Sequence, residues 1–336
     1  MSRKQAIVLT IVVAVVLLGI SLFLSLHSKP TTTTSQAAPW PKLRIGYLPI
    51  AAGLPLFVAV EEGYFRERGI DFELVRFSSS NEVGNAATAD RIDILSPTAS
   101  NVVFDIGHVS GKKHLVFAVN PYSNKPDHVT DYLIVRTGSG ISMLKQLEGR
   151  KVASFPGSVN RIFTQLILEK HGVPRTSYQY IELQPQDWEP SLQAKAIDAL
   201  SALEPEATQI MKDGVGTSIF PGFYADLLPD VPLSAHWVAA DFYARADKKM
   251  LAAFLDAFEK AILFCRNNPQ KAKVHLVKYA NVRPDILPDV NLNDWQRLAD
   301  IDASHFQRFI DILAENGALQ ARVDVRTYIL PDPRSQ

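Results

Sequence analysis

Apolar stretches alternate with turn-forming residues along the chain, and this pattern predicts a series of strand–helix units. The first unit has an apolar strand from Leu43 to Leu48, a loop rich in proline and small residues, and an apolar helix. Gly53 is placed to cap this helix, Pro55 falls in its first turn, and Gly63 is expected to end it in a left-handed conformation. A strand that leads into a helix start leaves backbone N–H groups and the positive end of the helix dipole facing a crevice. This unit therefore predicts a place for a small polar or anionic molecule.

The same order of elements continues as far as residue 118. Further strands are predicted at 70–75, 92–95 and 114–118, with helices between them. Ser79 and Glu82 have the spacing of a capping box at one helix start. Ser96 followed by Pro97 predicts a second helix start, with the serine as cap and the proline in the first helical position. Alternating strands and helices are typical of a parallel sheet that is covered on both faces.

A second group of units follows a loop with two prolines at 120–130. Its strands are predicted at 132–136, 151–154, 178–183 and 199–203. We interpret the proline-rich stretch 221–232 as the return to the first group. A strand at 234–239 and helices at 248–267, 269–279, 293–300 and 303–316 are predicted to follow. The predicted fold class is α/β in two lobes joined by two crossings, with 42–127 and 233–336 in lobe 1 and 128–232 in lobe 2.

The N-terminal region has a different pattern. Residues 6–26 are uncharged and apolar behind Arg3 and Lys4, and this run is long enough to cross a bilayer. The positive flank predicts a cytoplasmic N-terminus and an extracytoplasmic globular part. A cleaved signal peptide is the alternative, but its apolar run is usually shorter and no small-residue cleavage site follows directly. We interpret 1–26 as a signal anchor that tethers the protein to the inner membrane, and 27–41 as a linker.

The composition restricts the possible partners. Lys plus Arg and Asp plus Glu number 35 each, so the chain lacks the basic excess that is typical of nucleic-acid binding. The one cysteine, Cys265, excludes an internal disulfide and a Cys-rich metal site, and its apolar surroundings favour an inert buried thiol. The eight histidines show no metal-ligand spacing. We expect a monomer that binds no cofactor, no metal and no nucleic acid.

Candidate binding residues gather at six junctions between a strand and the following helix. In open α/β sheets these junctions lie at the carboxyl edge of the strands, where ligands bind. A single junction is more often a plain helix cap, whereas six junctions in two lobes favour a shared cleft. The candidates are Pro49, Ala52, Gly53, Ser79, Ser80, Asn81, Thr98, Ser100, Pro156, Gly157, Ser158, Arg161, Asp187, Trp188 and Glu204.

Several of these candidates have two interpretations. Trp188, which follows Asp187 on a predicted loop, could stack on a planar or apolar ligand or pack between the lobes. Arg161 could pair with an anion, although the fourth residue of a helix more often points to solvent. Glu204 could accept a hydrogen bond from a ligand amine or cap a helix. The helix start at 156–158 is predicted to be a good anion site.

Enzyme signatures are missing from the sequence. It has no Gly-x-Ser-x-Gly elbow and no phosphate-binding loop, and the turn from Gly138 to Gly140 lacks the third glycine of a dinucleotide fingerprint. These absences favour a binding protein over an enzyme.

Taken in order, the motifs resemble the ABC-importer solute-binding proteins of the nitrate, sulfonate, taurine and thiamine-precursor group. No single motif is specific, but their order and spacing are, over residues 42–265. The matching segments are Gly46-Tyr47, Pro55–Ala59, Gly63–Phe65, Gly69–Asp71, Ile92–Ile94, Leu147–Val152, Pro156–Ser158, Ile197–Ala199 and Glu204-Pro205.

The resemblance implies a type II periplasmic binding fold, in which two lobes close on a small solute and present it to an ABC permease. The long N-terminal apolar segment departs from the secreted pattern of this family, but a tethered protein could still serve a nearby permease. Two alternatives stay open. The same fold supports a pyrimidine-synthesising enzyme, whose Cys-rich and His-rich motif is absent here, and it also suits a ligand-sensing module for a partner receptor.

Overall fold

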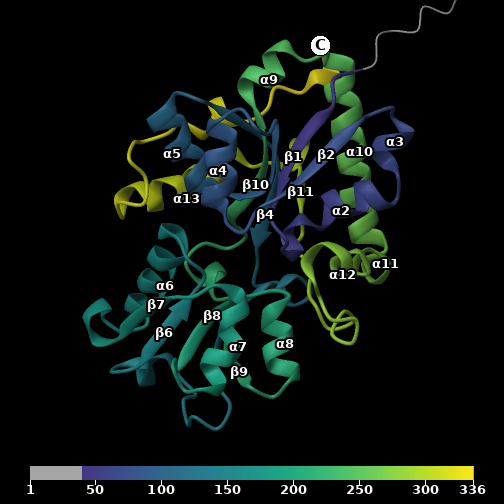
Figure 1. The fold of residues 1–336 in the computed structure, drawn as a ribbon. Coiled ribbons are helices and arrows are strands. Elements are labelled where there is room, and N and C mark those ends of the chain that lie inside the picture. The colour runs from purple at the N-terminus through teal and green to yellow at the C-terminus, as the bar shows by residue number, and fades with distance from the viewer. Residues whose placement is uncertain (1–39, 336) are drawn as a thin grey trace, which may run out of the picture. The chain divides into compact units, whose positions relative to one another are not determined.

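Two β-sheets carry the fold of residues 40–335, the part of the chain that this computed structural model describes (Figure 1). The six-stranded sheet contains β1 (Leu43–Tyr47), β2 (Phe72–Arg76), β3 (Ile94–Ala99), β4 (His114–Tyr122), β10 (Val231–Ala239) and β11 (Gln296–Arg297). The five-stranded sheet contains β5 (Asp131–Arg136), β6 (Lys151–Ser154), β7 (Gln179–Glu182), β8 (Ala199–Leu203) and β9 (Gly216–Pro221). We refer to each sheet with its helices as the six-stranded half and the five-stranded half.

Both sheets combine a parallel trio with antiparallel strands. The first has the order β11-β4-β10-β3-β1-β2 and the second the order β7-β6-β8-β5-β9. β1 is parallel to β2 and β3, whereas β10 is antiparallel to both β3 and β4. In the second sheet β5 is antiparallel to β8 and β9. The strands on which the prediction of a parallel sheet rested, β1 to β4, run in one direction, but the sheet is mixed because β10 returns from the other half and inserts antiparallel between β3 and β4.

Helices cover both faces of the six-stranded sheet. Its helices are α2 (Leu54–Glu61), α3 (Tyr64–Glu67), α4 (Ser80–Thr88), α5 (Ser100–Ser110), α9 (Ala240–Arg245), α10 (Lys248–Asn267), α11 (Pro269–Lys273), α12 (His275–Ala280) and α13 (Ala303–Glu315). Figure 1 shows α2, α3 and α10 on one side of this sheet and α4, α5 and α13 on the other. Aromatic pairs fill both faces: Phe65 stacks on Phe254 on the first, and Phe104 meets Trp237 edge-on at 5.5 Å on the second. The five-stranded half carries α6 (Ser158–Lys170), α7 (Pro185–Gln193) and α8 (Glu206–Lys212).

The opening unit of the sequence forms as predicted. β1 leads through a 3₁₀ turn, η1 (Ala51–Gly53), into α2, with Gly53 as its cap and Pro55 in its first turn. Gly63 has a φ of +76°, the left-handed conformation that ends this helix before α3 begins. Because every residue of α2 from Leu54 to Ala59 is buried, the strand–helix junction is held rigidly.

Two predicted helix positions were wrong because strand pairing between distant segments decided them. Ser96 and Pro97 lie inside β3, and α5 begins only at Ser100. The register between β10 and β3 shifts opposite these two residues, and such a bulge accommodates a proline that cannot donate to the ladder. The predicted helix at 293–300 is instead β11, which pairs with the edge of β4, followed by the 3₁₀ turn η6 (Leu298–Asp300).

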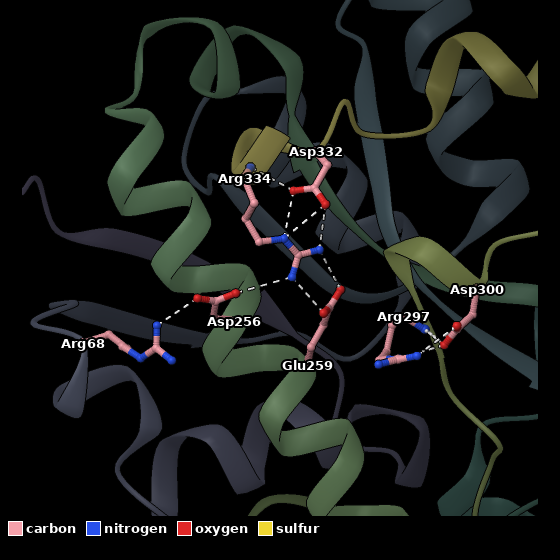
Figure 2. Close-up of polar contacts among 7 residues, drawn as sticks. All are labelled: Arg68, Asp256, Glu259, Arg297, Asp300, Asp332 and Arg334. Atoms are coloured by element: carbon pink, nitrogen blue, oxygen red, sulfur yellow. Dashed lines mark hydrogen bonds and ion pairs between the residues drawn. The ribbon is translucent and has the colours of Figure 1, made fainter. Parts of the chain in front are cut away.

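The C-terminal residues are fixed to α10 by a group of charged side chains (Figure 2). Arg334 forms a two-pronged ion pair with Glu259 at 2.8 and 3.2 Å and also contacts Asp332. Asp256, one turn earlier on α10, bonds to both Arg334 and Arg68. The group therefore joins the end of the chain, α10 and the end of α3.

The chain passes between the two sheets at 123–130 and again at 222–230. The lobe boundaries predicted for 42–127 with 233–336 and for 128–232 stay a prediction. Within residues 40–335 no helix is both long and apolar enough to cross a membrane. The predicted anchor at 1–26 and the linker as far as residue 39 lie outside the described residues.

Candidate functional site

A cavity of about 750 Å³ is lined by residues of both halves. This volume is within the range of about 300–1,000 Å³ that is usual for small-molecule sites. The cavity wall includes residues that follow β3, β6 and β8 and residues at the starts of η1, α4, α5, α6, α7 and α8. Six helical starts thus contribute to one space, at the carboxyl edges where open α/β sheets bind ligands.

Local hydrogen bonds place the start of α4 on this wall. The Ser79 hydroxyl accepts from the Glu82 N–H at 3.2 Å, and the Glu82 carboxylate accepts from the Ser78 N–H at 2.9 Å. The predicted capping box therefore forms with its return bond shifted by one residue. The Ser80 hydroxyl accepts from the Ala99 N–H at 3.1 Å, which fixes α4 against the end of β3.

The start of α6 lies opposite, and it touches the six-stranded half. Gly157 has a φ of +134°, a conformation that other residues rarely adopt, and it turns the chain from β6 into α6. Asn101 on α5 donates from Nδ2 to the Ser158 hydroxyl at 3.0 Å. This hydrogen bond joins two helix starts, one from each half.

Buried polar groups lie in and behind the cavity wall on the side of the six-stranded sheet: Thr98 and Ser234 line the cavity, and Asn120, His236 and Ser96 lie behind them. The Thr98 side chain is buried, and its hydroxyl has no hydrogen-bond partner among the described residues. Ser234 accepts from the Asn120 amide at 3.1 Å, Asn120 contacts His236 Nε2 at 2.8 Å, and His236 Nδ1 contacts Ser96 at 2.7 Å. Burial lowers the pKa of His236 to about 3, so the imidazole is neutral and can link Ser96 to Asn120.

Two glutamates at the start of α8 differ in their partners. Glu204 is 4% exposed and accepts from the Thr208 hydroxyl at 2.7 Å, the Thr208 N–H at 3.2 Å and the Tyr132 hydroxyl at 3.3 Å. Glu206 is half-buried, and no other side chain of the described residues bonds to its carboxylate. Burial raises the pKa of each carboxyl to about 7, and the Glu204 charge adds to the effect on Glu206.

The charged residues of the wall have one sign. Of the described residues that line the cavity, those with ionisable acidic or basic chains are Asp105, Glu204 and Glu206, besides Tyr122; none is Lys, Arg or His. Within residues 40–335, no group of three or more His, Cys, Asp or Glu side chains is placed to hold a metal ion. The charged groups of this cavity are therefore acidic.

Ten of the fifteen candidate residues line this cavity, and five do not. The ten are Ala52, Ser79, Ser80, Asn81, Thr98, Pro156, Gly157, Ser158, Trp188 and Glu204. Pro49, Gly53, Ser100, Arg161 and Asp187 lie away from it. Ser100 is buried and donates to the Pro232 carbonyl at 3.0 Å, whereas Arg161 and Asp187 are exposed on their helices. Gly53 is buried against Phe57, and Pro49 is half-buried ahead of η1.

Trp188 lies in helix α7 and not on the predicted loop. The sequence did not predict this helix, because Pro190 lies inside it and proline usually interrupts a helix interior. The Trp188 side chain is buried, its Nε1 donates to the Leu183 carbonyl at 2.9 Å, and Phe155 meets it edge-on at 6.4 Å. Packing fixes the ring, so it contributes an apolar part of the wall.

The sequence did not single out several lining residues. Asn101 lies one residue beyond the predicted strand–helix junction at 96–100, and Glu206 is the last residue of the predicted junction at 204–206. The sequence argument could therefore have included both. Val102, Ile106 and Val109 of α5 also line the cavity. Their side chains form one stripe of the helix, but nothing in the local pattern distinguishes a stripe that faces a cavity from one that faces the core.

A comparison with family models finds that the NMT1/THI5-like family matches residues 52–272. A protein of Bacillus subtilis (strain 168), described as a candidate aliphatic sulfonates-binding protein, is 24% identical over 245 residues. The alignment covers 69% of this chain and 66% of that protein, just under two thirds of its length.

Solved structures with the same fold include binding proteins and an enzyme. The alkanesulfonate-binding protein SsuA of Xanthomonas axonopodis pv. citri, bound to MOPS, has a TM-score of 0.71 and 18% identity over 88% of this chain and 99% of that one. The periplasmic nitrate-binding protein NrtA of Synechocystis PCC 6803 has a TM-score of 0.67 and 17% identity over 85% and 84%. The desulfurization enzyme DszB has a TM-score of 0.64 and 14% identity over 88% and 98%. The similarity establishes the fold, which serves both binding and catalysis in these proteins.

Proposed function

Because the chain belongs to the NMT1/THI5-like family, we propose that it is the extracytoplasmic solute-binding component of an ABC importer. It captures a small polar or anionic organic solute between its two halves and delivers it to a membrane permease. Residues 6–26 tether it to the inner membrane, and it acts as a monomer without a cofactor. The binding site comprises the ten candidate residues that line the cavity, together with Asn101 and Glu206.

One observation carries this proposal: a single cavity receives helical starts from both halves. A solute in that space contacts both halves at once, so closure around it gains contacts that the open form lacks. Between residues 40 and 335 the chain crosses from one sheet to the other only through 123–130 and 222–230, which are short enough to serve as hinges.

A binding role is favoured over catalysis by the groups that the cavity lacks. Cys265 lies in the core of the six-stranded half, and burial raises the pKa of its thiol, so it is a poor nucleophile. His236 contacts Ser96, but both side chains are buried and neither lines the cavity. Because an enzyme has the same fold, catalysis is one alternative function to be tested. A sensor for a partner receptor is the second alternative.

Calorimetric titration of the purified chain with nitrate, taurine, alkanesulfonates and aminopyrimidines tests the proposal. We expect saturable one-to-one binding of one solute class, with the solute recovered unchanged. Conversion of the solute to a product would replace the proposal with an enzyme, and the absence of binding by any solute would contradict it. Loss of solute uptake in cells that lack the protein would separate an importer from a sensor.

A further inference from the structure

We propose that the cavity selects a solute with a cationic nitrogen group on an apolar body, and that it discriminates against sulfonate and nitrate. This inference rests on the proposed function and names the solute class for the same site. It depends on the charges of the wall, on the polar groups that lack partners, and on the apolar stripe of α5.

The charges of the wall favour a cation. The formal charges that line the cavity belong to Asp105, Glu204 and Glu206, and no basic side chain lines it. A helix start contributes only a fraction of a positive charge, and only within its first turn. At the start of α8 this partial charge already interacts with the Glu204 carboxylate, which accepts from the Thr208 N–H. An anionic head group would meet like charges in a partly desolvated space, which is unfavourable.

Of the two glutamates on the wall, Glu206 is the one that remains for a solute, whereas Asp105 on α5 accepts from the Gln320 N–H at 3.3 Å. Glu204 is held by Thr208 and Tyr132, and the buried Lys273 ammonium on α11 interacts with it electrostatically. Glu206 has no such neighbour among the described residues, and the group that acts on its charge is Glu204, of like sign. A nitrogen cation would supply the donors and the charge that this carboxylate lacks.

An unpaired polar group in the other half supports the same solute. The Thr98 hydroxyl is buried in the cavity wall without a partner among the described residues. A buried hydroxyl in this state loses free energy unless a ligand provides the hydrogen bond. An amidinium or ammonium group has several N–H donors, so it can donate to a carboxylate and to a hydroxyl at the same time.

The rest of the wall suits an apolar body. Val102, Ile106 and Val109 are spaced four and three residues apart, so they line one side of α5, and Val109 is 70% exposed. Trp188 and Phe155 contribute apolar surface from the five-stranded half. Nitrate has no apolar part that could cover these surfaces.

Matched probes test the inference: benzamidine, neutral benzamide and benzenesulfonate share one apolar ring and differ in the head group. Calorimetry on the full chain at pH 8 should show that benzamidine binds about tenfold more tightly than benzamide, since a charge-assisted hydrogen bond is worth more than a neutral one. Benzenesulfonate should bind more weakly than both. The variant E206Q should weaken benzamidine about tenfold and leave benzamide little changed.

The variant E182Q is the control, because it removes the same charge from an exposed position of β7 outside the cavity. It should bind all three probes as the wild type does, and thermal melts should show that both variants fold. Lowering the pH from 8 to 5 passes the Glu206 pKa of about 7 and protonates the carboxyl. Benzamidine affinity should therefore fall more in the wild type than in E206Q, because Glu204, Asp105 and Lys273 are present in both and Glu204 is protonated over the same range.

Equal or tighter binding of benzenesulfonate, or an unchanged benzamidine affinity in E206Q, would overturn the inference. The proposed function would survive that result if a sulfonate or nitrate in the broader titration binds saturably. If none of the probes and none of the solutes in the broader titration binds, both the inference and the proposed function fail.

Discussion

Two glutamates two positions apart show how partners decide the role of a residue. Glu204 is surrounded by donors and joins α8 to β5, whereas Glu206 faces the cavity without a partner among the described residues. The sequence offered both roles for Glu204, as a helix cap or as a ligand acceptor. The structure assigns capping to Glu204, and the carboxylate available to a solute is its neighbour.

This assignment makes Glu204 important for stability. We expect E204A to lower the free energy of unfolding by about 2–3 kcal/mol, because the Thr208 hydroxyl and N–H lose their acceptor in a buried site. E206A should not lower it, since no other side chain of the described residues bonds to that carboxylate. Urea denaturation measures both, and equal losses in the two variants would contradict the assignment.

Buried Asp131 predicts a pH dependence of stability. One carboxylate oxygen accepts from the Tyr224 N–H at 2.7 Å, the other has no partner among the described residues, and burial raises the pKa from 3.8 to about 7. Between these values the folded chain holds a proton that the unfolded chain releases. The contribution of Asp131 to stability is therefore complete below about pH 4 and is lost as the pH rises through 7.

The variant D131N isolates this contribution, because it keeps the acceptor and cannot ionise. The free energy of unfolding of D131N relative to the wild type should rise by about 2–3 kcal/mol between pH 5 and pH 8. His236 and Glu204 titrate in both proteins, so their contributions cancel in the difference. Urea denaturation across this range is the measurement, and a difference that does not vary with pH would rule the explanation out.

At the scale of elements, the charged group around Arg334 holds the end of the chain on α10. Its side chain is 27% exposed, and its partner Glu259 is 15% exposed, so water screens this pair less than an open surface pair. We expect R334A to lower the free energy of unfolding by about 1 kcal/mol. R326A is the control, because Arg326 is 80% exposed and its ion partner is its near neighbour Asp324. Urea denaturation that shows the same loss for both variants would contradict this role.

The elements that the sequence predicted well are those fixed by local interactions. Helix α10 spans Lys248–Asn267 as predicted, because the Asp247 cap and the apolar period of the helix both depend on residues that are close in sequence. The errors at Ser96-Pro97 and at 293–300 have one cause: each segment pairs with a strand that lies far away in the sequence.

The candidate site was predictable to the same extent. The junction argument found the helix starts that line the cavity, since it requires only the order of strands and helices. It did not find which side of each helix faces the cavity, so it included Arg161 and omitted Glu206. The charge of the wall follows from that orientation, and this is why the sequence left the ligand class open.

At the scale of the whole molecule, contacts between the halves surround the two crossings and the cavity. Asn293 donates to Thr130 at the end of the first crossing at 3.1 Å, and Asn291 donates to Tyr132 of β5 at 3.2 Å. Near the cavity, Asn101 and Ser158 provide a further bond between the halves. A solute must fit beside that bond or replace it, so Ser158 is the position where a large side chain would interfere most.

Calorimetric titration of the variant S158W, beside the wild type, tests most directly that a solute binds between the halves. The solute is whichever compound of the nitrate, taurine, alkanesulfonate and aminopyrimidine series binds the wild type. S142W is the control, since Ser142 is exposed in the same half and does not line the cavity. We predict that S158W melts at the wild-type temperature and binds at least about 100-fold more weakly, because the indole fills space that the solute needs, whereas S142W binds normally. Wild-type affinity in a folded S158W would contradict the account.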